Sequence, residues 1–293
     1  MNKIIVIVGP TGVGKTKLSI ELAKRYDGEV INADAVQVYK GLDIGSAKVT
    51  LEEMDGIRHH LLDIKEVGDD YSIYHYQTDC RCKIEDVLNR GKLPIIVGGT
   101  GLYIKAALYD YKLSFENKCN TYDELSNDQL YAMLKDMDRG IVIDRFNRRR
   151  LIRAINYYVE NNKSISENKT DKLLYDALFI GLTTDRDILY DKINSRVDEM
   201  ISSGLVEEVK HFYDKKISGR PLMTAIGYKE VYSYLEGNCS FEEMVNMIKL
   251  NSRHYAKRQY TFFRNQLPTV WFNTDYDNFD NTVKEVEDYV ESI

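Results

Sequence analysis

The chain contains the stretch Gly9-Pro10-Thr11-Gly12-Val13-Gly14-Lys15-Thr16 between an apolar run at residues 4–8 and a helical pattern that starts near Lys17. Its glycines let backbone N–H groups turn around an anion, and the N-terminus of a helix adds partial positive charge. Lys15 supplies a full positive charge, and the Thr16 hydroxyl is a ligand for Mg²⁺. The stretch therefore predicts a P-loop that binds a polyphosphate, with Mg²⁺ as cofactor. It does not say whether a phosphoryl group is transferred.

The composition is that of an ordinary globular protein, with 293 residues, 43% hydrophobic and 29% charged, and a net charge of −6. This length accommodates one large domain or two. A strand at residues 4–8 leaves no room for a signal peptide, and the apolar runs are too short to span a bilayer. We expect a cytoplasmic protein with no membrane partner, and we also expect a monomer.

The four cysteines are Cys80, Cys82, Cys119 and Cys239. Their spacing matches neither a two-pair zinc pattern nor a disulfide framework. A structural zinc site needs four ligands, which the pair in residues 80–82 cannot supply alone. We expect free thiols.

Short apolar runs alternate with helical patterns along the first part of the chain, and one more apolar run follows later. Such runs are typical of buried parallel strands, and the alternation predicts an α/β fold with right-handed crossovers. The expected fold is a P-loop NTPase-like parallel sheet flanked by helices. The strands are expected at residues 4–8, 29–32, 93–97 and 177–182, and the helices between them at 17–26, 74–90 and 102–108.

The middle of the chain changes character. Residues 113–172 are polar and predict a helical insertion, or lid, carried by a core made of residues 1–112 and 173–293. Beyond residue 182 the pattern is almost wholly helical. The insertion should hold helices at 124–137 and 148–161, and the C-terminal part at 186–202, 205–215, 227–234, 241–263 and 281–293.

Asp34 ends the second expected strand and should face the P-loop, because ligands gather at the carboxyl ends of parallel strands. One interpretation makes it a general base or a partner of Mg²⁺. The other makes it a helix cap or turn carboxylate, and position alone does not separate the two. Gln37 offers a donor and an acceptor, which suits a base edge.

The stretch Gly98-Gly99-Thr100-Gly101 follows the third expected strand, where P-loop NTPases often carry an acidic residue that holds Mg²⁺. Its glycines permit close approach of the backbone to a ligand, and Thr100 presents a hydroxyl. A plain strand-to-helix turn explains the glycines but less readily the threonine. The missing acid argues against assuming a kinase or an ATPase.

His59 and His60 are adjacent in an extended stretch, so their side chains point to opposite faces and cannot easily share a metal. We favour a structural pair, and the alternative is that one of them contacts the substrate.

Two clusters of positive charge stand out in this acidic chain. The cluster nearer the C-terminus is interleaved with aromatic residues, which favours binding of nucleic-acid phosphates over a merely solvated face. The first comprises Arg145, Arg148, Arg149, Arg150 and Arg153, and the second Arg253, Lys257, Arg258 and Arg264, with Tyr255, Tyr260, Phe262 and Phe263 between them.

Taken together, these motifs resemble the tRNA dimethylallyltransferases of the bacterial type, also called tRNA isopentenyltransferases. The resemblance spans most of the chain, in order. It departs at Ala35, where family members usually carry Ser. The matching stretches are residues 9–16, 32–39, 43–48, 59–63, 98–103, 194–209, 225–230 and 253–264.

The resemblance implies transfer of a dimethylallyl group from its diphosphate to N6 of adenine-37, beside the tRNA anticodon. Lys15 and Mg²⁺ at Thr16 would stabilise the leaving diphosphate. Asp34 would accept the N6 proton, and Thr100 would hold either the reacting amine or the bridging oxygen. The insertion would contact tRNA as a lid. The implied tRNA-binding residues are Asp34, Ala35, Val36, Gln37, Thr100, Arg148, Arg149, Arg150, Arg153, Arg253, Lys257 and Arg258.

Three other functions remain open. A P-loop kinase of small molecules or nucleotides is supported by residues 9–16 alone. An RNA-binding adaptor would keep the P-loop as a relic. A prenyltransferase acting on free adenine nucleotides would not need the two basic clusters.

Overall fold

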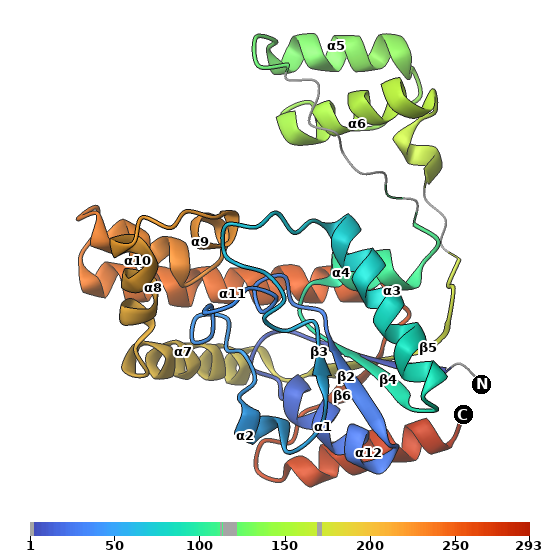
Figure 1. Cartoon of the computed structure of the whole chain (residues 1–293), viewed down its shortest axis with the longest axis vertical. Helices are drawn as coiled ribbons and strands as arrows, with labels where there is room; N and C mark the ends of the chain where they lie inside the picture. The colour runs from blue at the N-terminus through green and yellow to red at the C-terminus, as the bar shows by residue number, and fades with distance from the viewer. Residues whose placement is uncertain (1–2, 112, 114–121, 169–171) are drawn as a thin grey trace. The chain divides into compact units, whose positions relative to one another are not determined.

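A computed structural model describes residues 3–111, 113, 122–168 and 172–293 of the chain. It divides into two compact units (Figure 1). The main unit comprises Met1–Leu108 and Tyr175–Ile293, and the insertion unit comprises Tyr109–Leu174. Cys119 lies outside the described residues.

The main unit is built on a six-stranded sheet in the order β3-β2-β4-β1-β5-β6, and every strand pair is parallel. This confirms the predicted parallel α/β fold. The strands are β1 (Lys3–Val8), β2 (Gly28–Asn32), β3 (His59–His60), β4 (Leu93–Val97), β5 (Asp176–Thr183) and β6 (Val270–Asn273).

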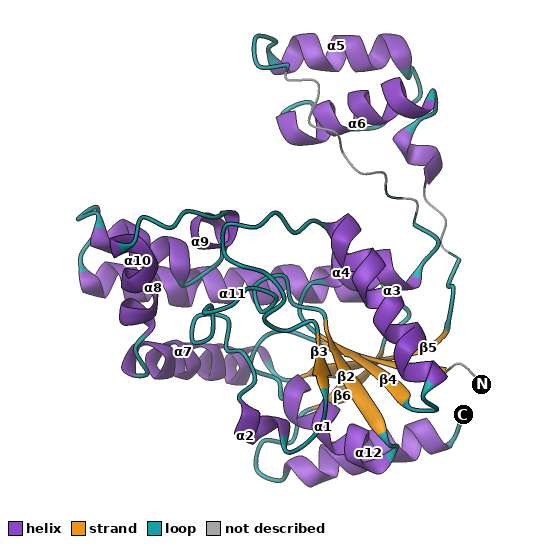
Figure 2. Ribbon diagram, viewed as in Figure 1, coloured by secondary structure: helices purple, strands orange, loops and turns teal. Residues whose placement is uncertain are grey.

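Both faces of the sheet are covered, with α3 and α4 on one side and α1 and α12 (Phe279–Glu291) on the other (Figure 2). Alternate strand residues such as Ile5, Ile7 and Ile95 join one core with Leu18 and Leu22 of the first helix. The intervening residues, among them Ile4, Val6 and Ile96, are also fully buried. This double burial explains why the strands read as continuous apolar runs. The helices that follow β1, β2, β3 and β4 are α1 (Lys15–Arg25), α2 (Leu51–Met54), α3 (Ile73–Asn89) and α4 (Gly101–Leu108).

The C-terminal part is almost wholly helical, as predicted, and its helices between residues 186 and 266 form a region beside the sheet (Figure 1). Its longest helix has 26 residues, so it runs for about 39 Å at 1.5 Å per residue. A capping box between Ser240 and Glu243 fixes where it begins. The helices here are α7 (Arg186–Ser202), α8 (Leu205–Asp214), α9 (Arg220–Thr224), α10 (Tyr228–Leu235), α11 (Phe241–Gln266) and α12 (Phe279–Glu291).

The insertion unit packs α5 (Asn127–Met137) against α6 (Arg148–Asn161), followed by the short 3-10 helix η1 (Ile165–Asn168). Leu130 and Leu134 of α5 meet Leu151 and Ile155 of α6 in a separate apolar cluster. Helix α5 begins three residues later than the sequence predicted, because Ser126 caps it by accepting a hydrogen bond from the Gln129 N–H.

Candidate active site

Three loops that follow neighbouring parallel strands meet at one edge of the sheet. The P-loop, residues 9–16, follows β1; residues 33–37 follow β2; and residues 98–100 follow β4. The carboxyl ends of parallel strands share an edge, so this is where a ligand of such a fold binds.

The P-loop has the left-handed backbone that glycine tolerates, with φ of 90° at Gly12 and 86° at Gly14. The Lys15 ammonium turns back and donates to the Pro10 carbonyl at 2.7 Å. Burial lowers the pKa of Lys15 to about 7, and the charge of Arg196 lowers it further, while Asp34 acts in the opposite direction. The loop thus concentrates positive charge that a bound anion would stabilise.

Arg196 is a site residue that sequence reasoning missed. It projects from α7 and donates to the Thr11 hydroxyl at 2.9 Å. Burial lowers the pKa of Arg196, and Asp34 partly compensates. The only signal in the sequence was that Arg196 falls in the matched segment 194–209. The guanidinium therefore adds a second cation to the P-loop.

Asp34 is held by its own turn. Its Oδ1 accepts from the Val36 N–H at 2.8 Å and from the Gln37 N–H at 3.4 Å. Buried Asn32 accepts from the Asp34 N–H at 3.0 Å and donates to the Asp34 carbonyl at 3.2 Å. The turn interpretation is therefore correct for Oδ1. It does not exclude the general base, because a carboxylate has a second oxygen.

Thr100 joins the loops after β2 and β4. Its hydroxyl accepts from the Ala35 N–H at 3.1 Å, and its N–H donates to the Ala33 carbonyl at 3.0 Å. A Cβ at Gly98 would lie 2.3 Å from the Ala33 carbonyl group, and one at Gly99 would lie 2.2 Å from Gln259 Nε2. The groups that require glycine here therefore belong to the chain itself.

Gln259 of α11 links the P-loop to the end of β4. Its Nε2 donates to the Gly99 carbonyl at 3.0 Å, and its Oε1 accepts from the Thr11 N–H at 3.3 Å. Tyr255, one turn earlier, donates to the same Gly99 carbonyl at 3.3 Å. Burial, reinforced by the charge of Asp34, raises the pKa of Tyr255 to about 12. Helix α11 thereby holds the P-loop and the loop after β4 together.

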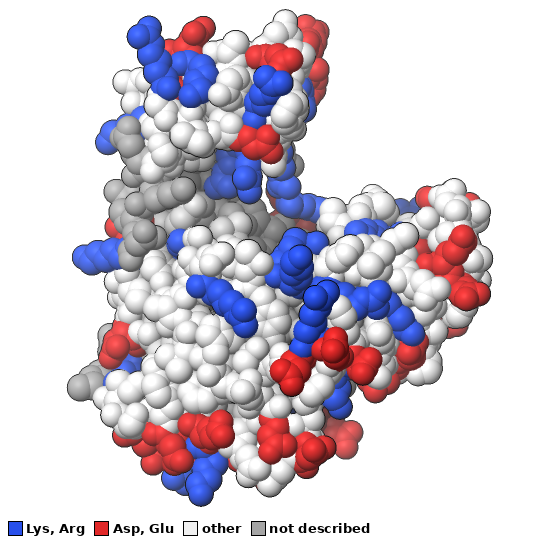
Figure 3. All heavy atoms as spheres, turned by 180° about the vertical axis from the view of Figure 1, so that it is seen from behind, with Lys and Arg blue, Asp and Glu red and all other residues white. Residues whose placement is uncertain are grey.

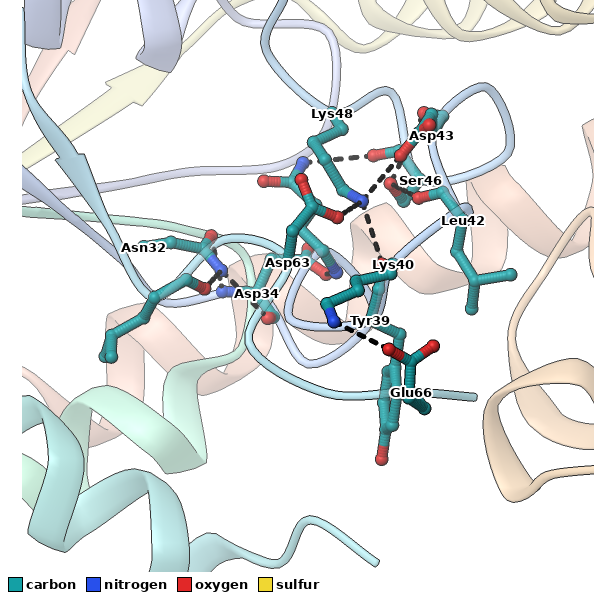
Figure 4. Close-up of polar contacts among 12 residues, drawn as sticks. Asn32, Asp34, Tyr39, Lys40, Leu42, Asp43, Ser46, Lys48, Asp63 and Glu66 are labelled. Atoms are coloured by element: carbon teal, nitrogen blue, oxygen red, sulfur yellow. Dashed lines mark hydrogen bonds and ion pairs between the residues drawn. The ribbon is translucent and has the colours of Figure 1, made fainter. Parts of the chain in front are cut away.

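The loop at residues 43–48 closes beside Gln37, whose amide donates to the Ser46 and Ala47 carbonyls at 3.1 and 3.3 Å. Figure 4 shows the Lys48 ammonium between the carboxylates of Asp43 and Asp63 and the Tyr39 carbonyl, at 2.6, 2.5 and 2.8 Å. Only 5% of the Lys48 side chain is exposed. The amide donors of Gln37 thus hold this loop.

Glu208 of α8 also holds this loop through hydrogen bonds. Its carboxylate accepts from the N–H groups of Asp43, Ile44 and Gly45 at 3.0, 2.7 and 3.2 Å. The Tyr228 hydroxyl donates to it at 2.7 Å. A carboxylate on several N–H groups is a strong, charge-assisted arrangement, so the loop is held in one conformation.

The basic residues of α11 differ in their contacts. Arg253 donates to Asn194 Oδ1 at 2.6 Å, whereas Lys257 and Arg258 are exposed. The Arg258 guanidinium lies 5.6 Å from the centre of the Tyr255 ring. Figure 3 shows lysines and arginines gathered near the middle of the visible face of the main unit, with acidic residues beside them and toward its edges.

The arginines of the insertion unit also divide. Arg148 donates to the Leu125 and Tyr122 carbonyls, both at 2.6 Å, so it ties α6 to the chain before α5. Arg149, Arg150 and Arg153 are exposed. Exposed Phe146 lies beside them, with the Arg145 guanidinium 4.7 Å from its ring centre.

The histidines lie on β3 as a pair with different surroundings. His60 is buried, and its Nε2 lies 2.6 Å from Glu29 Oε2, while the Arg90 guanidinium binds both oxygens of the same carboxylate. His59 Nδ1 lies 2.9 Å from the Ile57 carbonyl. His60 therefore has the structural role that we favoured.

The donor set at the P-loop fits Mg²⁺. Thr16 is exposed at the start of α1, and Mg²⁺ is commonly bound by one or two protein oxygens together with substrate phosphates. Within the described ranges, no group of three or more His, Cys, Asp or Glu side chains could hold a metal on its own. A metal here would depend on the phosphates of a substrate.

Comparison with known proteins matches the IPP transferase family to residues 37–266. The chain belongs to the IPP transferase family. A tRNA dimethylallyltransferase of Anoxybacillus flavithermus is 48% identical over 99% of this chain and 96% of its own length. That of Bacillus subtilis is 46% identical, over 92% and 90%.

Solved structures of IPP transferases agree. The tRNA isopentenylpyrophosphate transferase of Staphylococcus epidermidis has a TM-score of 0.76 and 40% identity, covering 99% of both chains. A eukaryotic dimethylallyltransferase acting on tRNA has a TM-score of 0.87 and 29% identity, covering 99% of this chain and 80% of that one. In this family member, no helix among the described residues is long and apolar enough to cross a membrane.

Proposed function

We propose that this chain transfers the dimethylallyl group of dimethylallyl diphosphate to N6 of adenine-37, beside the anticodon of tRNA, and releases diphosphate. The C1–O bond of the donor breaks, the C1–N6 bond forms, and the proton of N6 passes to a base. The chain acts as a monomer in the cytoplasm. Its membership of the IPP transferase family supports this reaction, and so does the arrangement of the P-loop, Asp34 and Thr100.

The P-loop binds the diphosphate. Negative charge grows on this group as the allylic carbon leaves it, and the cations of Lys15 and Arg196 lie where they stabilise that charge. Thr16 would hold Mg²⁺ against the phosphate oxygens. When bound, the metal supplies further neutralisation of the leaving group.

Asp34 is the base that accepts the N6 proton. Its Oδ1 is held by the Val36 and Gln37 N–H groups, so the carboxylate is fixed in orientation and its other oxygen is available. A positioned general base contributes about 10²–10⁴-fold to the rate.

Thr100 donates a hydrogen bond to the bridging oxygen of the prenyl diphosphate and keeps its proton. Its hydroxyl oxygen accepts from the Ala35 N–H, and the hydroxyl keeps a proton that it can donate in a hydrogen bond. An ether-type phosphate oxygen that gains charge in the transition state is a better acceptor than an adenine amine.

The RNA is bound by exposed cations on both units. Lys257 and Arg258 of α11, with Arg253 beside them, contact phosphates, and so do Arg149, Arg150 and Arg153 of the insertion unit. Arg148 acts by holding the insertion unit together. Ala35, Val36 and Gln37 line the adenine. A base in an anticodon loop is already single-stranded, so its extrusion costs only about a few kcal/mol.

The observation that carries the proposal is the family match, together with the carboxylate of Asp34, which lies close enough to the P-loop for its charge to act on Lys15. The experiment incubates the protein with labelled dimethylallyl diphosphate and either an anticodon stem-loop or free AMP. We expect label on the RNA and not on AMP. Absence of label on RNA, under conditions in which both ligands bind, contradicts the proposal.

A further inference from the structure

The segment that follows β6 runs along the P-loop and contacts three consecutive residues of it. We call residues 274–279 the strap. Thr274 Oγ1 donates to the Val13 carbonyl at 3.0 Å, and Tyr276 Oη donates to the Gly12 carbonyl at 3.1 Å. The Phe279 ring fills the space beside Gly14, where a Cβ would lie 2.5 Å from the ring.

These contacts bear on the direction of the N–H groups. In a trans peptide, the C=O of one residue and the N–H of the next lie in one plane and point in opposite directions. The Gly12 carbonyl shares its peptide with the Val13 N–H, and the Val13 carbonyl shares its peptide with the Gly14 N–H. Hydrogen bonds that draw both carbonyls toward the strap therefore turn both N–H groups away from it, toward the anion side.

The strap is itself fixed, so it can hold the loop. The Thr274 N–H donates to the Thr183 carbonyl of β5 at 2.8 Å. Asp275 Oδ1 accepts from the N–H groups of Asp277 and Asn278 at 3.0 and 2.8 Å, and the Asp275 N–H donates to the buried Thr282 hydroxyl at 2.8 Å.

Two lysines pack on the aromatic rings of the strap. Lys192 of α7 lies 4.7 Å from the centre of the Tyr276 ring, and Lys17 of α1 lies 4.8 Å from that of Phe279. Each of the two rings is thereby packed against a lysine. The Tyr276 hydroxyl is a protonated donor at neutral pH, since burial raises the pKa of Tyr276 to about 12.

We infer that Thr274 and Tyr276 are positioning residues for diphosphate: by hydrogen-bonding the Gly12 and Val13 carbonyls, they preset the N–H groups that bind the anion. The inference rests on the proposed function, in which the P-loop binds the diphosphate of the prenyl donor. A preset loop loses less conformational freedom on binding, so removal of either hydroxyl should weaken affinity without touching the ligand.

The test measures the affinity for inorganic pyrophosphate by titration calorimetry, with Mg²⁺ present throughout. The variants are Tyr276→Phe, Thr274→Val and both together, and each removes a hydroxyl while keeping the shape of the side chain. Thr274→Ser keeps the hydroxyl and serves as the conservative variant. Tyr26→Phe is the matched control, because it removes a tyrosine hydroxyl that donates to Glu291 at the other end of α1, away from the P-loop.

We expect each single variant to weaken pyrophosphate binding by about threefold to tenfold, the range of one net hydrogen bond. The double variant should lose at least the product of the two effects. Thr274→Ser and Tyr26→Phe should bind like the wild type. With prenyl diphosphate as substrate, KM should rise by the same factor while kcat and the affinity for the stem-loop stay constant.

The possible outcomes distinguish a failure of the proposed function from a failure of this inference alone. Wild-type protein that fails to bind pyrophosphate overturns the proposed function of the P-loop and this inference with it. Wild-type binding that Tyr276→Phe and Thr274→Val leave unchanged overturns the inference alone. A lowered melting temperature with unchanged affinity also overturns it, because the strap would then serve only stability.

Discussion

The hydroxyl oxygen of Thr100 lies 3.1 Å from the backbone nitrogen of Ala35 and accepts its hydrogen bond. This contact ties the turn that carries Asp34 to the end of β4. In the proposed reaction, the hydroxyl of Thr100 donates a hydrogen bond to the bridging oxygen of the donor. In that reaction, one side chain would both position the base and contact the leaving group.

Replacement of Thr100 separates these two roles. Thr100→Val removes both hydrogen bonds and should lower kcat by about 10²-fold, the lower range for one donor that stabilises developing charge. Thr100→Ser keeps the hydroxyl and should retain most of the activity. Single-turnover rates with labelled dimethylallyl diphosphate check this, and equal activity of Thr100→Val and wild type would remove Thr100 from the reaction.

Asp34→Asn should abolish base catalysis with little effect on the fold. The amide oxygen still accepts from the Val36 N–H, so the turn persists, while the rate should fall by about 10²–10⁴-fold. The affinities for pyrophosphate and for the stem-loop should stay within about twofold of the wild-type values. Turnover near the wild-type rate would show that another group accepts the proton.

Arg196→Gln should weaken the P-loop for anions. It removes a cation that donates to the Thr11 hydroxyl at 2.9 Å, and charged hydrogen bonds are worth about 1.5–3 kcal/mol. We expect pyrophosphate affinity to fall by about 10- to 100-fold, since 1.4 kcal/mol is a factor of ten. Arg186→Gln, on the exposed side of the same helix, is the control and should bind normally.

The Glu29 carboxylate makes stability depend on pH. The Arg90 guanidinium is the main cause that lowers its pKa from 4.5 to about 2, with help from His60. The folded pKa lies below the unfolded one, so the stabilisation is complete above pH 4.5 and is lost as pH falls toward 2. The shift corresponds to about 3 kcal/mol.

Urea unfolding at pH 6 and pH 3 checks this, with Glu29→Gln as the comparison. The wild type should lose more unfolding free energy between the two pH values than the variant does. Parallel losses in both proteins would mean that Glu29 does not contribute the pH dependence.

Exposed cations of α11 should set the salt dependence of RNA binding. Lys257→Gln and Arg258→Gln should each reduce the slope of log affinity against log salt by about 0.7–0.9. Lys24→Gln is the control, because Lys24 lies at the end of α1 and pairs with Asp55. A slope that the first two variants do not change would place the RNA elsewhere.

The sequence predicts the elements whose signals are local. Residues 93–97 form a continuous apolar run bounded by polar or glycine residues, and β4 has these bounds. The two-residue strand β3 and the four-residue edge strand β6 were missed, since neither is long enough to show a period. Helices α2 and α9, with four and five residues, were not predicted for the same reason.

The site was predictable only where its residues adjoin a motif. Lys15 lies in the glycine-rich motif after β1 and Asp34 closely follows β2, whereas Arg196 reaches Thr11 across 185 positions and Gln259 reaches it across 248. Nothing in the local pattern of a helix marks such a long-range contact. Gly98 and Gly99 were interpreted as making room for a ligand, yet their neighbours are Ala33 and Gln259.

The insertion unit begins and ends at one place, because Tyr109 and Leu173 form an antiparallel bridge and the Asp110 N–H donates to the Lys172 carbonyl at 3.0 Å. A segment whose ends already touch can change length, or be exchanged whole, at little cost in loop-closure entropy. The insertion unit can therefore vary in evolution as one piece, while the six strands of the main unit keep their register. A short peptide joining residue 109 to residue 174 would leave the main unit alone for study.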